Sequence, residues 1–355
     1  MHYIVAGGGT GGHIYPAVAI AERLSDRGTV TMLARSGSME ERVFLSRGLD
    51  VRTVNSAPLL YTPRSLWQLA CATRGGVRAA QRVMADTQAD AFIGTGGYVS
   101  VPGIVAAQMS GVPVYLLEQN TVMGRANRLF SRYARHVFLG FPIEGVSDSR
   151  FTVTGNPLRR KVYTALTECR SNRPLRRGLL FIGGSGGANF VNELFLRTIR
   201  EMESRGRAVS VTVVTGTEHY ARIRDAVDGL SLRHVNPVVV SYEEHMERLY
   251  EQTRVAVTRG GALALTELAV GGIYAVVIPY PFAVGKHQAK NAAYLESLRL
   301  GIRIEQQSLQ FEEYLSIVEK ALDDETGPAL PASSIFGSDA AGTIAHTIEE
   351  ECSHG

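Results

Sequence analysis

The sequence predicts an α/β protein built from two similar domains, each a doubly wound parallel sheet. Apolar strand-like runs alternate with helical patterns along most of the chain, which is typical of such sheets. A glycine-rich pentad, Gly8–Gly12, follows an apolar run near the N-terminus and recurs 175 positions later as Gly183–Gly187. The length of 355 residues also suits two domains, at roughly 100–200 residues per domain.

The composition excludes several classes of protein. With 45% hydrophobic and 20% charged residues, the chain is neither disordered nor fibrous. We expect no membrane-spanning helix, because no run of about 18 apolar residues is free of charges or breakers, and no secretory signal. Three scattered cysteines, Cys71, Cys169 and Cys352, favour neither a disulfide framework nor a metal cluster, so the cytoplasm is the expected compartment.

The expected elements follow from these apolar runs. In the first half we predict strands at residues 3–6, 29–34, 51–54, 91–93, 112–117 and 136–139, with a helix at 14–24 after the first glycine loop. In the second half we predict strands at 179–182, 210–215, 238–240, 255–258 and 275–279, with a helix at 189–202. Because the two halves begin alike, we predict two similar α/β domains with a cleft between them, and both glycine loops should line that cleft.

A break at Gly155-Asn156-Pro157 divides the chain into domains at 1–158 and 159–338, with 159–177 read as a linker. The sequence leaves open which domain the C-terminal helix at 339–352 packs against, and we assign it to the first. Residues 1–158 contain 15 Arg, no Lys and 10 acidic residues, a net charge of +5, whereas the rest has −2. A basic half favours an anionic partner, but not specifically nucleic acid.

The first glycine loop is a candidate phosphate site. Gly7, Gly9 and Gly12 match G-x-G-x-x-G, which lets the backbone and a helix N-terminus approach a phosphate. The acid that a dinucleotide fold needs about 20 residues later is absent, and Arg35 stands there instead. An NADP site through Arg35 and a simple tight turn both remain open.

His13 directly follows this loop at the start of the helix. A histidine in a first turn often has no special role. A helix N-terminus, however, disfavours the imidazolium, so a neutral ring there can accept a proton as a general base.

Polar residues follow other strands of the predicted sheets. Gly96-Gly97-Tyr98 lies in a third glycine run, and Glu118-Gln119-Asn120 ends an apolar strand. In the second half, a carboxylate at Glu267 could accept ribose hydroxyls, and Gln288 and Asn291 share a helix face. Loop caps or solvated faces are the alternatives for each. No Asp-x-Asp occurs, so the common carboxylate pair for a divalent metal is missing, and no zinc-type cluster appears.

A basic stripe lies between residues 51 and 85. Arg74, Arg78 and Arg82 are spaced i, i+4, and Arg52 and Arg64 lie in the same stretch, which has no acid. Apolar residues precede the stripe: Leu59, Leu60, Leu66, Trp67 and Leu69. This combination suits an anionic membrane surface, and a solvated helix face is the alternative.

Seven short motifs occur in order along the chain. They are Gly8-Gly9-Thr10-Gly11-Gly12-His13, Gly96-Gly97-Tyr98, Glu118-Gln119-Asn120, Gly155-Asn156-Pro157, Gly183-Gly184-Ser185, Gly261-Ala262-Leu263 with Glu267, and His287-Gln288 with Asn291. As an ordered set, from about residue 4 to 300, they resemble the MurG family of peptidoglycan N-acetylglucosaminyltransferases. The resemblance implies a GT-B fold, with two Rossmann-like domains facing a deep cleft.

The resemblance also implies a reaction and a place for it. Such an enzyme transfers GlcNAc, with inversion, from UDP-GlcNAc to the 4-hydroxyl of MurNAc in undecaprenyl-diphospho-MurNAc-pentapeptide (lipid I), giving lipid II. It works as a peripheral protein at the cytoplasmic face of the inner membrane. The first domain would face the acceptor and the anionic membrane, the second would bind UDP-GlcNAc, and no cofactor, metal or nucleic acid is implied.

Site residues follow from the matching motifs. His13 and Glu118 are the implied candidates for the catalytic base, and His13 is preferred; Gly96, Gly97 and Tyr98 form the implied acceptor and diphosphate loop. The implied donor-binding residues are Thr10, Gly11, Gly12, Asn120, Arg159, Ser185, Glu243, Ala262, Leu263, Ala264, Leu265, Thr266, Glu267 and Gln288. Of these, Ser185 would bind diphosphate, Glu267 the ribose and Gln288 the GlcNAc.

Three alternatives stay open. Another UDP-sugar enzyme of the same fold, such as a UDP-GlcNAc 2-epimerase, would share the donor-binding domain. The His13 loop and Gly96-Gly97-Tyr98 argue against it, because they favour a lipid acceptor. An NADP-dependent oxidoreductase would leave the second glycine loop and Glu267 unexplained. A non-enzymatic scaffold would have no need of His13, Glu118 or Gln288.

Overall fold

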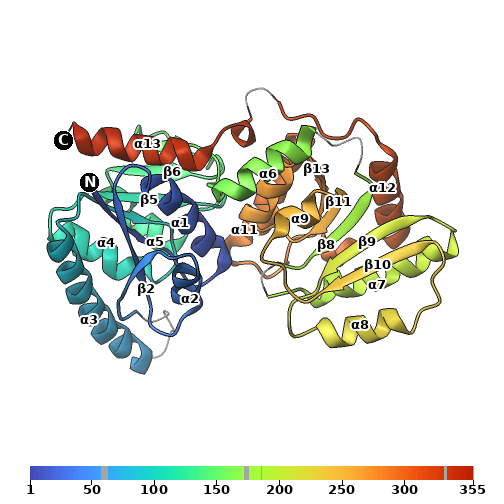
Figure 1. The fold of residues 1–355 in the computed structure, drawn as a ribbon, viewed down its shortest axis with the longest axis horizontal. Helices are drawn as coiled ribbons and strands as arrows, with labels where there is room; N and C mark the ends of the chain where they lie inside the picture. Colours follow the sequence, from blue (N-terminus) through green and yellow to red (C-terminus); the bar gives the residue numbers. More distant parts are fainter. Residues whose placement is uncertain (57–62, 172–175, 185, 332–333, 355) are drawn as a thin grey trace. The chain divides into compact units, whose positions relative to one another are not determined.

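Two parallel β-sheets organise the chain in the computed structural model (Figure 1). It describes residues 1–56, 63–171, 176–184, 186–331 and 334–354, with the side chains of all of these except 63–73. The chain divides into two compact units, one formed by Met1–Arg160 and Ser338–Gly355 and the other by Lys161–Gly337.

The first unit holds a seven-stranded sheet in the order β3-β2-β1-β4-β5-β6-β7. Its elements are β1 (His2–Ala6), α1 (Gly11–Leu24), β2 (Thr29–Ala34), α2 (Met39–Ser46), β3 (Asp50–Thr53), α3 (Pro63–Thr87), β4 (Ala91–Gly94), α4 (Ser100–Met109), β5 (Val114–Glu118), α5 (Arg125–Phe130), η1 (Ser131–Tyr133), β6 (His136–Leu139), β7 (Phe151–Val153) and α13 (Ala340–Ser353). Helix α13 lies beside α1, and its Ile344 and Ile348 are buried in the same core cluster as Ile14 and Ile20.

The second unit repeats this strand order in a six-stranded sheet, β10-β9-β8-β11-β12-β13. Its elements are α6 (Arg160–Ser171), β8 (Gly178–Ile182), α7 (Asn189–Ser204), β9 (Val209–Val214), α8 (Tyr220–Asp228), β10 (Val235–Val240), α9 (Met246–Tyr250), β11 (Thr253–Thr258), α10 (Ala262–Val270), β12 (Tyr274–Val277), η3 (Val284–Lys286), α11 (His287–Ser297), β13 (Gly301–Arg303), η4 (Gln306–Ser308), α12 (Phe311–Asp323) and η5 (Ile335–Gly337).

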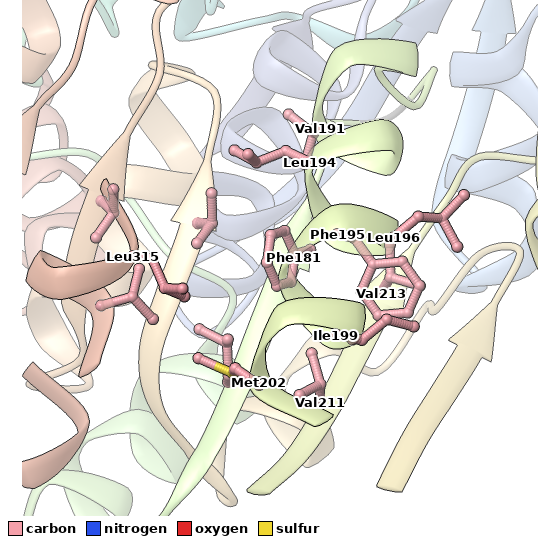
Figure 2. Close-up of a cluster of buried hydrophobic side chains, with 14 of the residues drawn as sticks. Phe181, Val191, Leu194, Phe195, Leu196, Ile199, Met202, Val211, Val213 and Leu315 are labelled. Atoms are coloured by element: carbon pink, nitrogen blue, oxygen red, sulfur yellow. The ribbon is translucent and has the colours of Figure 1, made fainter. Parts of the chain in front are cut away.

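The helices form because their apolar residues recur at helical spacing. Along α7, Val191, Leu194, Phe195, Ile199 and Met202 are all buried, a stripe that faces the sheet. Figure 2 shows these side chains meeting those of β8 and β9, namely Phe181, Val211 and Val213. Burying each such side chain contributes roughly 1.5–3 kcal/mol, so this face holds α7 on the sheet.

The predicted fold class is confirmed, since both sheets are parallel and doubly wound. The prediction for one stretch of the chain was wrong. Residues 159–177, read as a linker, contain α6. Its buried side chains, Val162, Leu166 and Cys169, have helical spacing of four and three. The basic residues between them obscured this stripe. The short edge strands β7 and β13 were also missed.

Candidate active site

The first and third glycine runs lie at the centre of the first sheet. The first joins β1 to α1 and the third joins β4 to α4; β1 and β4 are neighbours where the strand order reverses. The Thr95 N–H donates to the Ala6 carbonyl at 2.8 Å, which ties the two loops together. Ligands of doubly wound sheets bind at this switch point, outside the carboxyl ends of the strands.

His13 lies in the first turn of α1, and its ring is held by the third glycine run. Its Nδ1 is 2.9 Å from the Thr95 carbonyl oxygen. A carbonyl only accepts, so Nδ1 carries a proton, and in the neutral form of the ring the lone pair lies on Nε2. The bond is reciprocal, because the Thr95 hydroxyl donates to the His13 carbonyl at 2.8 Å.

Gly96 forms a wall against this ring. Its φ is +99°, and a Cβ added there would lie 2.8 Å from His13 Nδ1 and 2.9 Å from Cε1. Only glycine combines this backbone with so close a contact. Gly97 and Tyr98, the other two residues of this predicted loop, follow at the same edge of the sheet. The centre of the Tyr98 ring is 5.7 Å from the Arg35 guanidinium carbon.

Thr10, Gly11 and Gly12 form the entry to α1. Thr10 is extended, with φ −146°, and its carbonyl accepts from the N–H groups of His13 and Ile14 at 3.0 and 3.1 Å. Gly11 and Gly12 are the first residues of the helix. Their N–H groups have no carbonyl of the helix to bond, so they face outward at its positive end.

Glu118 ends β5 and is 2% exposed. Its carboxylate accepts four hydrogen bonds: Oε1 from Asn120 N and Nδ2 at 3.1 and 3.2 Å, and Oε2 from Gly124 N and Asn127 Nδ2 at 2.7 and 2.9 Å. Both oxygens therefore organise the loop that follows β5, and they place Asn120.

Gln119 and Thr95 were not predicted as site residues. Gln119 Nε2 donates to the Thr95 carbonyl at 2.5 Å, the same oxygen that holds His13. The backbone carbonyl of Gln119 accepts from Asn156 Nδ2 at 3.1 Å, which links the Gly155-Asn156-Pro157 motif to the site. Gln119 lies inside the Glu118-Gln119-Asn120 motif, but no pattern in the sequence predicts its contact with Thr95, which is 24 residues away.

Arg159 lies in the first unit, after that motif. It is 9% exposed, and its guanidinium carbon is 4.7 Å from the centre of the Tyr15 ring. Tyr15 is two residues after His13 in α1. A cation–π contact therefore holds Arg159, which is predicted to bind the UDP-GlcNAc donor, near the same end of the helix.

In the second unit, the predicted residues Ala262 to Glu267 form the first part of α10. Within this set Ala262, Leu265 and Thr266 are buried, while Leu263, Ala264 and Glu267 are half-buried. The Glu267 carboxylate accepts a hydrogen bond from the Tyr250 hydroxyl at 2.8 Å. Tyr250 was not predicted as a site residue.

Gln288 is fixed at the start of α11. Its Oε1 accepts from Gly260 N at 3.2 Å and from Tyr280 N at 2.9 Å, which identifies Nε2 as the donor end of the amide. A Cβ at Gly260 would lie 2.3 Å from the Gln288 carbonyl oxygen, so only glycine permits this approach. Asn291, fully buried, donates to the Gly260 carbonyl at 3.0 Å and thus supports the loop.

Arg259 supports the neighbouring loop. Its guanidinium donates to the Ile278 carbonyl at 3.0 Å and lies 3.4 Å from that of Pro279. Burial lowers the pKa of Arg259 from its usual value, although an arginine stays charged at neutral pH. The charged guanidinium therefore fixes the segment after β12. In that segment the Tyr280 N–H donates to Gln288 Oε1.

Two other residues predicted to bind the UDP-GlcNAc donor are Ser185 and Glu243. Ser185 lies outside the described residues; beside it, the Gly187 N–H donates to the Gly184 carbonyl at 2.9 Å, and the loop leads from β8 into α7. Glu243 lies between β10 and α9 and accepts from the His245 N–H at 2.7 Å.

The basic stripe forms part of α3, where Arg74, Arg78 and Arg82 are all exposed. Of the apolar residues before it, Leu59 and Leu60 lie outside the described residues, as do the side chains of Leu66, Trp67 and Leu69. Among the helices that the structure describes, none combines the length and the apolar character needed to span a membrane.

Comparisons with known proteins identify the family. The glycosyltransferase family 28 N-terminal domain matches residues 3–139, and the glycosyltransferase family 28 C-terminal domain matches residues 178–342. The UDP-N-acetylglucosamine--N-acetylmuramyl-(pentapeptide) pyrophosphoryl-undecaprenol N-acetylglucosamine transferase of Acidithiobacillus ferrooxidans is 33% identical over 330 residues, covering 90% of this chain and 89% of the relative.

Two solved structures share the fold. MurG of Acinetobacter baumannii superposes with a TM-score of 0.75 at 23% identity, covering 100% of this chain and 99% of the other. A UDP-GlcNAc 2-epimerase of Methanocaldococcus jannaschii reaches 0.67 at 13% identity, covering 100% and 99%. The two sheets are thus those of the GT-B fold, and the sequence match over most of the chain shows that the protein belongs to the MurG family of glycosyltransferases.

Proposed function

We propose that this enzyme transfers GlcNAc from UDP-GlcNAc to the 4-hydroxyl of MurNAc in lipid I, with inversion, and so makes lipid II for peptidoglycan synthesis. Family membership supports the donor and the acceptor, which relatives carry in their names. The observation that carries the mechanism is the hydrogen bond between His13 Nδ1 and the Thr95 carbonyl.

His13 is the general base in this proposal. With its proton on Nδ1, the ring accepts through Nε2 the proton that the acceptor hydroxyl loses. The hydroxyl oxygen attacks the anomeric carbon of GlcNAc from the face opposite to UDP, and the bond to the UDP oxygen breaks. The Thr95 carbonyl then stabilises the imidazolium, because it already accepts the Nδ1 proton.

Glu118 has a different role, as the anchor of the loop after β5. Its two oxygens already accept four hydrogen bonds, and taking up a proton would break at least one of them. We therefore assign Glu118 to holding Asn120, which contacts the donor sugar.

The second unit binds the donor. Gln288 presents Nε2, a donor, to a GlcNAc oxygen, since its Oε1 is held by two backbone N–H groups. Glu267 accepts the ribose hydroxyls, Ala262 to Thr266 and Glu243 surround the nucleoside, and the loop around Ser185 with the N-terminus of α7 holds diphosphate. We assign Thr10, Gly11 and Gly12 to the donor sugar and diphosphate, Arg159 to the donor phosphates, and Gly96, Gly97 and Tyr98 to the acceptor.

Transfer of radiolabelled GlcNAc from UDP-GlcNAc to a short-chain lipid I analogue, with EDTA present, tests this function. We expect a β-linked product, which also tests whether a divalent metal is needed. Release of free GlcNAc, or formation of UDP-ManNAc without transfer, would instead support another UDP-sugar enzyme such as the epimerase.

The exposed stripe Arg74, Arg78 and Arg82 is proposed to contact the anionic cytoplasmic face of the membrane. Each basic residue near such a surface contributes about 1 kcal/mol. Changing all three to Glu should weaken binding to vesicles containing phosphatidylglycerol by roughly 100-fold or more. The matched control changes Arg224, Arg233 and Arg299, exposed arginines of the second unit, to Glu. Equal binding by both triple variants would refute the assignment.

A further inference from the structure

Tyr250 holds the carboxylate that the proposed function places on the ribose. It ends α9, is 1% exposed, and donates from its hydroxyl to Glu267 Oε2 at 2.8 Å. Helix α9 precedes β11 and α10 follows it in the chain, so this contact joins two helices through residues 17 positions apart. The acceptor is a carboxylate, which identifies the tyrosine as the donor.

The ring of Tyr250 cannot move freely, because it is buried, and a buried hydroxyl requires a partner. Glu267, by contrast, is half-buried and has a long side chain with several rotamers. A rigid donor on one oxygen therefore selects one carboxylate orientation before any ligand binds.

We propose that Tyr250 is a positioning residue that pre-orients Glu267 for the ribose hydroxyls of the UDP group. This inference rests on the proposed role of Glu267. Tyr250 acts through Glu267 in this proposal, because it removes the entropy loss that binding would otherwise impose on the glutamate side chain. Its effect should therefore appear in nucleotide affinity, and specifically in the recognition of ribose hydroxyls.

The experiment measures the affinities of UDP and 2′,3′-dideoxyuridine diphosphate by calorimetry for the wild-type enzyme and the Tyr250→Phe variant. Hydrogen bonds to a charged group contribute about 1.5–3 kcal/mol, so wild type should prefer UDP by roughly 10- to 100-fold. In Tyr250→Phe the preference should fall about 5-fold or more. The KM for UDP-GlcNAc should rise, while kcat at saturating donor stays within about 2-fold.

Tyr314→Phe is the matched control. Tyr314 is a fully buried tyrosine of the same unit, and its hydroxyl lies 3.2 Å from Thr198 Oγ1. This variant loses a buried hydroxyl too, but its preference for UDP should equal that of wild type. A double-mutant cycle adds a second measurement, because Tyr250→Phe should have little further effect on UDP affinity once Glu267 is changed to Ala.

Two results would overturn the inference, and they are distinguishable. If wild type binds both nucleotides equally, Glu267 does not bind the ribose and the proposed donor site fails together with the role of Tyr250. If wild type prefers UDP and Tyr250→Phe keeps the full preference, the donor site stands and Tyr250 does not position Glu267.

Discussion

At the scale of single residues, the site depends on how the His13 ring is held. Its Nδ1 proton points to the Thr95 carbonyl, which also accepts from Gln119 Nε2, and the Thr95 hydroxyl bonds the His13 carbonyl. The backbone at Gly96 closes one side of the ring. Two segments outside α1, the loop at Thr95 and Gly96 and the residue Gln119 after β5, thus set the direction of one imidazole, which is what a general base requires.

Gly96→Ala should disturb this arrangement. The new methyl group would lie within 3 Å of two ring atoms of His13 and force the ring to move, so we expect kcat to fall about 100-fold or more. Steady-state kinetics with saturating donor measure this.

Gly111→Ala is the control for backbone strain. Gly111 has φ +71° and nothing within 4 Å of an added Cβ. An alanine in this region costs about 1–2 kcal/mol of stability at either site. Gly111→Ala should therefore lower Tm without lowering kcat, and a similar loss of kcat in both variants would contradict the steric account.

The sequence indicates some of these residues and not others. His13 and Glu267 follow strands and glycine loops, so their position at the carboxyl edge of a sheet is predictable. The partners that orient them are not, because Thr95 is 82 residues from His13 and the contact is made through a backbone carbonyl. Tyr250 likewise looks like any core aromatic until its hydroxyl is located.

At the scale of elements, α13 completes the core of the first unit although it is the last helix of the chain. Its Ile344, Ala345 and Ile348 are fully buried with α1 residues such as Ile14 and Ile20. The helix begins at a capping residue, since the Asp339 side chain accepts from Gly342 N, and such a cap contributes about 1 kcal/mol.

Ile348→Ala should destabilise the first unit by about 2–5 kcal/mol, the usual range for such a truncation in a core. Chemical denaturation, followed by fluorescence, measures the change. His346→Ala is the control on the same helix: His346 is exposed and lies 3.2 Å from Glu350, and such surface pairs contribute about 0–1 kcal/mol. Equal effects of the two substitutions would show that α13 does not stabilise this core.

Elements were predictable where the apolar pattern is strong. The strands at the centres of both sheets are apolar runs buried on both faces, and this is the signal that the sequence displays. Helix α6 was missed because its stripe of Val162, Leu166 and Cys169 is narrow and lies among charged residues. The edge strands β7 and β13 have three residues each, too few to show a period.

At the scale of the whole molecule, two units with the same strand order each have their own core. Units of this kind can unfold in separate steps. In the proposed function the nucleotide binds mainly the unit formed by Lys161–Gly337, so UDP should stabilise that unit selectively.

Differential scanning calorimetry tests this selectivity. UDP at 100 times its Kd should raise the stability of one transition by about 2.7 kcal/mol and leave the other nearly unchanged. Tyr314→Phe should lower the transition that UDP raises, and Ile348→Ala should lower the other. If Ile348→Ala lowers the UDP-sensitive transition, the assignment of the nucleotide to the second unit is wrong.

In the proposed mechanism His13, and not Glu118, takes the proton from the acceptor hydroxyl. The most direct measurement compares kcat and UDP affinity for His13→Ala and Glu118→Gln. We expect His13→Ala to lower kcat by about 10²–10⁴ with UDP affinity and Tm nearly unchanged. Glu118→Gln should lower Tm, because an amide nitrogen would face the N–H donors that the carboxylate now accepts. If His13→Ala keeps its kcat, while Glu118→Gln loses it at wild-type Tm, Glu118 and not His13 is the base.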